Sequence, residues 1–233
     1  MLKIIHASYN LFQENTMAVW KDDDKRCAIV DPGFSTEREK EHFHTMLAEN
    51  GLKPEAIPLT HAHADHIFGV KSLQDEFGIP VYMHPEERKI LQFNTELCGS
   101  FRMPVPDSGF SFTEILDGSV VEIASMRFEV IGTPGHTPGG VCYYERQNET
   151  LLSGDTLFAG TIGRSDLKWG EYDDLIRSVM EKLMVLDSRT RVFPGHGPQT
   201  SIAREKSTNP FLEPFNEKEE EYPEDLEPIS ISH

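Results

Sequence analysis

The sequence has few cysteines, few basic residues and no long apolar run, and each shortage excludes a class of protein. Its three cysteines, Cys27, Cys98 and Cys142, are far apart and odd in number, so they form no disulfide framework and no paired-cysteine zinc knuckle. We interpret them as buried apolar residues of a protein in the reducing cytoplasm. No apolar run approaches the roughly eighteen residues of a transmembrane helix, and the first ten residues are too polar for a signal peptide.

Basic residues are the scarcer charged class. There are 22 Lys and Arg against 39 Asp and Glu, which gives a formal net charge of −17. A nucleic-acid surface needs clustered Lys and Arg, and an anionic membrane repels such a chain, so we expect neither partner. The last stretch, 211–233, holds eight acidic residues and one Lys. The sequence therefore predicts one catalytic domain over 1–210 and an acidic C-terminal tail over 211–233.

The elements predicted along the chain fall into two similar halves. Each half reads as strands, a helix, a strand and a further helix. A capping box of Thr36 and Glu39 begins the first helix, and apolar spacing predicts another over 172–186. The segment 94–112 contains several Pro and Gly residues and is predicted to be an irregular loop. Two such halves predict an α+β protein with two mixed sheets face to face and helices outside, a four-layer sandwich.

One short stretch, 60–66, gathers side chains that bind metals. It follows the apolar run 56–59, which reads as a strand, and it contains His61, His63, Asp65 and His66. Buried imidazoles and carboxylates need partners to offset their desolvation, and neither helix nor strand periodicity requires this spacing. The stretch predicts a metal site, because zinc, iron and manganese take such nitrogen and oxygen ligands.

Three further candidates follow predicted strands in the second half of the chain. His136 lies in the sequence TPGHTPG, Asp155 in SGDT and His196 in PGHG. The glycines permit close approach and unusual backbone torsions, and loops at strand ends often carry functional residues. We therefore expect these residues to complete the metal site.

Together, the four motifs resemble those of the metallo-β-lactamase superfamily over roughly residues 1–210. The resemblance implies an αβ/βα sandwich with two divalent metal ions. Zinc is the expected metal, and iron and manganese are the alternatives. A hydroxide between the two metals would be the nucleophile, and Asp65 and Asp155 would be catalytic residues. The implied ligands are His61, His63 and His136 for one metal and Asp65, His66 and His196 for the other, with Asp155 bridging the two.

Within this superfamily, the sequences around His136 and Asp155 are most similar to the glyoxalase II-like branch, the hydroxyacylglutathione hydrolases, in a short single-domain form. This similarity implies hydrolysis of a small-molecule thioester, either S-lactoylglutathione or a related acyl-thioester. A thiolate leaves without a strong general acid, since its conjugate acid has a pKa near ~8.5. Arg164 stands where that branch has a basic substrate-binding residue, so it is the candidate substrate contact, although the tyrosines that help that branch bind glutathione are absent.

Two alternatives to a thioester hydrolase stay open. A persulfide dioxygenase would use a mononuclear iron at the positions of His61, His136 and Asp155, and it shares the Gly-Arg-x-Asp stretch around Arg164. A metal-binding partner module without enzymatic activity is the other alternative, and the complete set of ligands argues against it.

Overall fold

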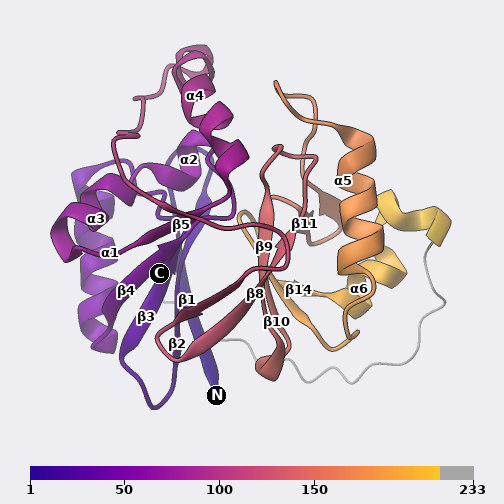
Figure 1. The fold of residues 1–233 in the computed structure, drawn as a ribbon, viewed down its shortest axis with the longest axis horizontal. Helices are drawn as coiled ribbons and strands as arrows, with labels where there is room; N and C mark the ends of the chain where they lie inside the picture. Colours follow the sequence, from indigo (N-terminus) through magenta and orange to yellow (C-terminus); the bar gives the residue numbers. More distant parts are fainter. Residues whose placement is uncertain (216–233) are drawn as a thin grey trace.

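The structure is a computed structural model that describes residues 1–215. In this part of the chain two six-stranded sheets lie face to face, and helices cover the outer face of each sheet (Figure 1). The strand orders are β1-β2-β3-β4-β5-β6 and β14-β13-β10-β9-β8-β7. The predicted four-layer αβ/βα sandwich is therefore confirmed.

The first half of the chain builds the first sheet. Its strands β1 (Leu2–Tyr9), β2 (Glu14–Lys21) and β3 (Arg26–Val30) pair antiparallel. Parallel pairing then adds β4 (Lys53–Pro58), β5 (Val81–Met83) and β6 (Thr113–Glu114). The crossover segments contain α1 (Glu37–Asn50), α2 (Ala64–Ile67), α3 (Val70–Phe77), η1 (Pro85–Glu87) and α4 (Arg88–Phe101).

The second half builds the second sheet and its covering helices. Its strands are β7 (Val120–Ile123), β8 (Met126–Gly132), β9 (Val141–Glu145), β10 (Thr150–Gly154), β13 (Arg191–Pro194) and β14 (Thr200–Ser201). Between them lie η2 (Arg146–Asn148), the ribbon β11 (Leu157–Phe158) and β12 (Thr161–Ile162), α5 (Tyr172–Ser178) and η3 (Val179–Leu183), and after β14 come α6 (Ile202–Thr208) and η4 (Pro210–Phe215). Because β9 is antiparallel to both β8 and β10, and β13 is parallel to β10, the strands β8, β10 and β13 share one direction.

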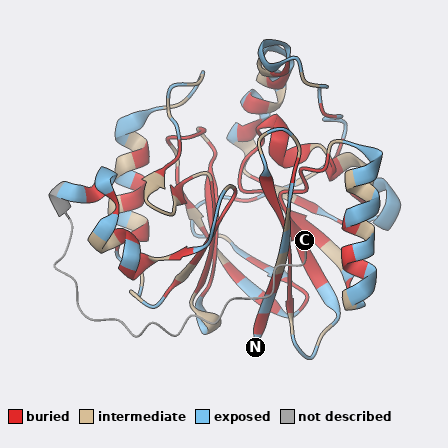
Figure 2. Cartoon of the chain, turned by 180° about the vertical axis from the view of Figure 1, so that it is seen from behind, coloured by how far each residue is buried: buried red, intermediate tan, exposed pale blue. Residues whose placement is uncertain are grey.

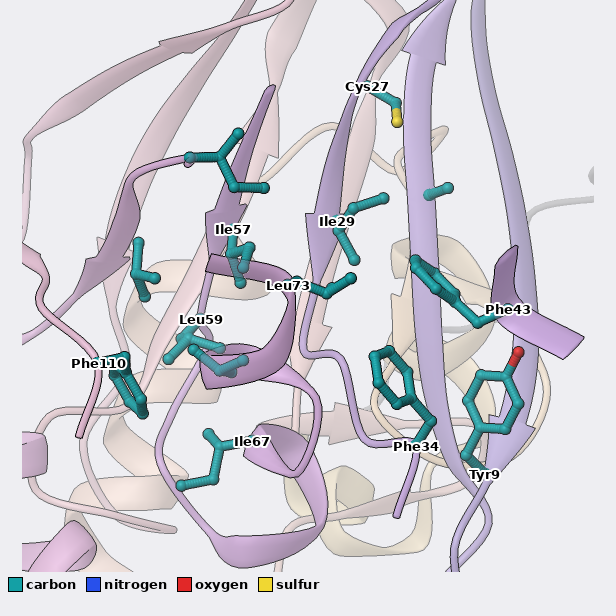
Figure 3. Packing of buried hydrophobic residues seen from close by; sticks show 14 of the residues in the cluster. Tyr9, Cys27, Ile29, Phe34, Phe43, Ile57, Leu59, Ile67, Leu73 and Phe110 are labelled. Atoms are coloured by element: carbon teal, nitrogen blue, oxygen red, sulfur yellow. The ribbon is translucent and has the colours of Figure 1, made fainter. Parts of the chain in front are cut away.

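Apolar side chains fill the three spaces between the four layers. Phe43, Ile57 and Leu73 belong to the core between the first sheet and its helices (Figure 3). Phe128 and Tyr143 are buried between the two sheets, and a third core lies between the second sheet and α5. Burial is concentrated on the sheets, while the helices expose their outer faces (Figure 2). The three cysteines are free and buried, as expected.

The helix α1 begins and ends where the sequence predicts. Thr36 Oγ1 accepts a hydrogen bond from Glu39 N (3.2 Å), and the Glu39 carboxylate accepts one from Thr36 N (3.1 Å). Gly51 ends the helix in the left-handed region, with φ of 64°. These caps satisfy backbone groups that a helix end leaves unpaired.

Three predictions of local structure were wrong or incomplete. Residues 94–101 are the second half of α4 rather than loop, because Ile90, Asn94 and Cys98 form a buried face at helical spacing. The helix predicted over 172–186 changes to π-helical geometry at 179–183 and ends there. The sequence also predicts that Phe211, Leu212 and Phe215 anchor the tail, and of these Leu212 is buried, whereas Phe211 is 44% exposed. The side chain of Phe215 and the predicted acidic tail from 216 onward lie outside the described residues.

Within residues 1–215, every helix is too short or too polar to span a membrane.

Candidate metal centre

The candidate ligands follow strands that end at one end of the sandwich. β3 and β4 are parallel, and the 60–66 stretch begins directly after β4. β8, β10 and β13 share one direction, and their carboxyl ends lead to His136, Asp155 and His196. Sites at the carboxyl ends of parallel strands are common because loops from several strands meet there. The structure therefore brings all seven predicted ligands together.

Two groups of metal-binding side chains assemble at this end. Within each group the candidate ligand atoms all lie within 4.8 Å of one another. Their composition matches the two ligand sets implied by the sequence. The first group is His61, His63 and His136, and the second is Asp65, His66 and His196.

The Asp155 carboxylate faces both groups. Its Oδ1 lies 3.4 Å from His66 Nε2, and its Oδ2 lies 3.5 Å from His136 Nε2 and 3.5 Å from His196 Nε2. A carboxylate that bridges two metals needs this central position, with one oxygen available to each side. The bridging role itself stays a prediction.

Three buried polar atoms at the centre lack hydrogen-bond partners in the described part of the chain. They are His61 Nε2, His63 Nε2 and Asp155 Oδ1. A buried polar atom left unpaired costs about 1–3 kcal/mol, so native proteins rarely leave several together. Metal ligation would satisfy such atoms. The residues thus fit a dinuclear metal site.

Backbone carbonyl groups orient two of the imidazoles. His136 Nδ1 donates to the Arg164 carbonyl oxygen (2.7 Å), and His196 Nδ1 donates to that of Phe12 (3.0 Å). Because a carbonyl oxygen only accepts hydrogen bonds, Nδ1 must carry the proton in both rings. The Nε2 atom of each ring then faces the centre, as in metal-binding histidines held by a second hydrogen bond.

Asp31 orients His66 and the stretch before it. Its Oδ2 lies 3.0 Å from His66 Nδ1 and accepts from Thr60 Oγ1 (2.5 Å), while its Oδ1 accepts from Thr60 N (2.8 Å). Asp31 also groups with His61 and His66 as a possible metal ligand. Since both its oxygens already accept hydrogen bonds, we assign it to positioning. Asp31 was not among the predicted site residues, although it directly follows β3, which pairs parallel with β4.

Glu87 and Asn94 hold the loops of the first group from the side of α4. The fully buried Glu87 carboxylate accepts from Ala62 N (2.7 Å) through Oε2 and from Gly139 N (2.9 Å) through Oε1. Asn94 Nδ2 donates to the Ala62 carbonyl oxygen (2.8 Å). One carboxylate thereby links the His61–His63 loop to the loop that carries His136. Neither residue was predicted, because 94–101 was taken as loop and no motif marks Glu87.

The turn between β1 and β2 holds the second group in a similar way. Asn10 Nδ2 donates to the Asp65 carbonyl oxygen (2.9 Å). Asn15 donates from its backbone N to the Gly195 carbonyl oxygen (2.7 Å) and from Nδ2 to that of Gly197 (2.8 Å). Neither asparagine was predicted, since isolated asparagines near a hairpin turn carry no specific signal.

The two groups differ in their electrostatics. Burial lowers the pKa of His61 well below its ordinary value and that of His63 to about 3, so both imidazoles are neutral at pH 7. Burial alone would lower the pKa of His66, but the carboxylates of Asp155 and Asp65 outweigh it and raise that pKa well above the ordinary value. Because a ligating imidazole must give up its proton, metal binding to the second group releases protons.

A cavity of about 430 Å³ opens onto the centre. Arg164 lines it, and its guanidinium donates to both carboxylate oxygens of Asp166 at 2.8 Å. Substrate contact by Arg164 therefore stays a prediction. The lining residues are Phe12, His63, Asp65, Leu97, Phe101, His136, Asp155, Phe158, Thr161, Ile162, Arg164, Leu167 and His196.

Known proteins share this fold and much of this sequence. Residues 9–196 match the family model of the Metallo-beta-lactamase superfamily. A Haemophilus influenzae protein named hydroxyacylglutathione hydrolase GloC is 35% identical over 207 residues, covering 86% of this chain and 93% of that protein.

Two crystal structures are similar over nearly their whole length. The BLEG-1 B3 metallo-beta-lactamase has a TM-score of 0.83 and 37% identity, over 90% of this chain and 99% of that one. TTHA1623 in a di-iron-bound form has a TM-score of 0.78 and 33% identity, over 89% and 100%. With a family model that spans most of its length and this similarity in fold, the chain belongs to the metallo-beta-lactamase superfamily.

Proposed function

We propose that the protein is a metal-dependent hydrolase of thioesters, of the glyoxalase II type, acting on S-lactoylglutathione or a related small acyl-thioester. The observation that carries the proposal is the position of Asp155 between two groups of candidate ligands at the floor of a cavity. The 35% identity to the protein named hydroxyacylglutathione hydrolase GloC supports the same reaction.

The lining of the cavity favours a leaving group that needs no proton donor. Of its titratable side chains in residues 1–215, all except Arg164 belong to the candidate ligands. Arginine stays protonated at ordinary pH and is a poor acid. A thiolate can leave unprotonated, whereas the nitrogen of an amide cannot. The described cavity therefore suits a thioester better than an amide.

Two divalent ions would be held by the two groups, with zinc, iron or manganese all compatible with nitrogen and oxygen ligands. When bound, such ions activate water near neutral pH and polarise a carbonyl oxygen. The di-iron-bound relative makes iron a candidate beside zinc.

The chain's own residues provide orientation and charge. The carbonyl groups of Arg164 and Phe12 hold the Nδ1 protons of His136 and His196, so the Nε2 atom of each ring faces the centre. Despite its burial, Asp155 has a pKa well below the ordinary value because of His66 and His196, and it stays ionised. Asp65 adds a second carboxylate beside His196, with Oδ2 3.3 Å from its Nε2. These fixed groups need little reorganisation during reaction.

Lactam hydrolysis is a second candidate, since the similar BLEG-1 structure is named a metallo-beta-lactamase. The test is an assay of one preparation whose bound metals have been counted. It compares S-lactoylglutathione and an acetyl thioester with a chromogenic cephalosporin, and it follows oxygen uptake on glutathione persulfide. We expect thioester hydrolysis to be fastest and oxygen uptake to be at background.

Two variants assign the activity to this site. His136→Ala should lose thioester hydrolysis, whereas His44→Ala, which changes a half-buried histidine paired with Glu76 on the helical face, should keep it. Faster cephalosporin hydrolysis, or oxygen uptake with one iron per chain, would overturn the proposal.

A further inference from the structure

The walls of the cavity differ in chemistry from its floor. The floor consists of candidate metal ligands, while six of the remaining lining side chains are apolar. They come from separate parts of the fold: the β1–β2 turn, α4, the β11–β12 ribbon and the segment before α5. These six residues, which we call the apolar wall, are Phe12, Leu97, Phe101, Phe158, Ile162 and Leu167.

Contacts among aromatic residues fix part of the apolar wall. The rings of Phe12 and Phe101 meet edge to face, with centroids 5.1 Å apart and planes at 88°. Phe158 lies against the His196 ring, at 6.3 Å between centroids. Phe12 also accepts the hydrogen bond from His196 through its carbonyl group. The apolar wall is thus continuous with the metal centre and is positioned by the same residues.

The apolar wall offers no free positive charge in the described residues. Arg164 is the one Lys or Arg among the described side chains that line the cavity, and Asp166 pairs with it through two parallel hydrogen bonds of 2.8 Å. A substrate carboxylate would have to compete with Asp166 for this guanidinium. A carboxylate placed against the apolar wall would lose water without gaining a partner there, which is costly.

We infer that the cavity binds an uncharged, apolar arm of the substrate. The inference rests on the proposed function and narrows it to thioesters that carry such an arm next to the reacting carbonyl. The arm is either the acyl chain or the thiol portion, because both begin at the carbonyl group.

Two series of substrates test the inference and separate the two arms. One series lengthens the acyl chain from acetyl to hexanoyl on N-acetylcysteamine. The other keeps acetyl and lengthens an alkane thiol from ethyl to hexyl, which leaves the pKa of the thiol nearly constant. Each methylene buried in the cavity should raise kcat/KM about fourfold, from ~0.8 kcal/mol per buried methylene.

The series in which kcat/KM rises identifies the arm. Flat values in both series, or a preference for a succinyl over a butanoyl thioester, would overturn the inference while leaving thioester hydrolysis intact. Failure of the acetyl thioester to react would instead overturn the proposed function. The inference about the apolar arm and the proposed thioester hydrolysis can therefore be refuted independently.

A pair of phenylalanine variants gives the matched control. Phe101 is 40% exposed and belongs to the apolar wall, while Phe77 is 38% exposed at the end of α3 and does not line the cavity. Phe101→Ala should lower the ratio of kcat/KM for the longest to the shortest substrate about tenfold, and Phe77→Ala should leave this ratio unchanged. Because both substrates are measured on one preparation, partial unfolding cancels from the ratio. An unchanged ratio in Phe101→Ala would contradict the inference.

Discussion

Gly195 provides the sharpest steric test of the metal centre. A Cβ at this position would lie 2.4 Å from Asp155 Oδ1 and 2.7 Å from His66 Cε1. Its backbone lies outside the positive-φ region, so the resistance to alanine comes from these two contacts and from the Gly154 carbonyl carbon at 3.3 Å. Gly195→Ala therefore pushes directly on the residue that faces both groups of ligands.

The size of the effect follows from the required displacement. Ordinary contact with a Cβ begins at 3.4 Å, so Asp155 Oδ1 or the backbone must move by about 1 Å. Misplacement of a catalytic group by about 1 Å costs on the order of 100-fold in rate. Disturbing the support of a metal ligand typically costs about 10–100-fold in metal affinity. We expect both losses in Gly195→Ala.

The assay combines chelator competition, which measures metal affinity, with the rate of thioester hydrolysis at saturating metal. Gly99→Ala is the matched control, because a Cβ there meets nothing within 4 Å and the residue is helical. The control should keep wild-type affinity and rate. Wild-type metal affinity in Gly195→Ala would refute the packing of Gly195 against Asp155 and His66.

Three further perturbations have defined outcomes. Asp155→Ala should abolish metal loading and hydrolysis together, and two metals per chain in that variant would contradict the bridging role. Burial raises the pKa of the Glu87 carboxyl group from 4.5 to about 7, so the folded protein keeps this proton at a pH where the unfolded chain has lost it. The free energy of unfolding therefore falls as the pH rises toward 7. Between pH 5.5 and 8 the free energy of unfolding of the metal-free wild type, measured by urea denaturation, should fall by about 2 kcal/mol more than that of Glu87→Gln. The same pH dependence in both proteins would contradict this prediction. Thr36→Ala removes the N-cap of α1 and should lower the free energy of unfolding by about 1 kcal/mol in the same denaturation experiment. An unchanged free energy of unfolding would show that this cap does not stabilise the protein.

The sequence was sufficient to single out the candidate ligands, because their types and spacing have no structural explanation. The stretch 60–66 needs partners for its imidazoles wherever it is buried, and glycine-flanked His136, Asp155 and His196 follow strands. The capping box at Thr36 and the alternation of β8 were likewise readable, since both depend on neighbours along the chain. Such features can be predicted from sequence because the residues that form them are neighbours along the chain.

The supporting residues could not be predicted because their partners are distant in sequence. Glu87 reaches Ala62 and Gly139 across 25 and 52 positions, and Asn15 reaches Gly197 across 182. The cavity wall was missed for a different reason. Proline and glycine in 94–112 suggested a loop, but burial of one face of α4 outweighed the cost of Gly99 in its last turn.

The most direct test of the account is a metal titration of the metal-free protein. Bound metal and the rate of hydrolysis of an acyl-thioester are followed together as a divalent ion is added. Because Asp155 faces both groups of ligands, the account predicts that the rate reaches its plateau at two bound ions per chain. A full rate at one bound ion per chain would contradict it.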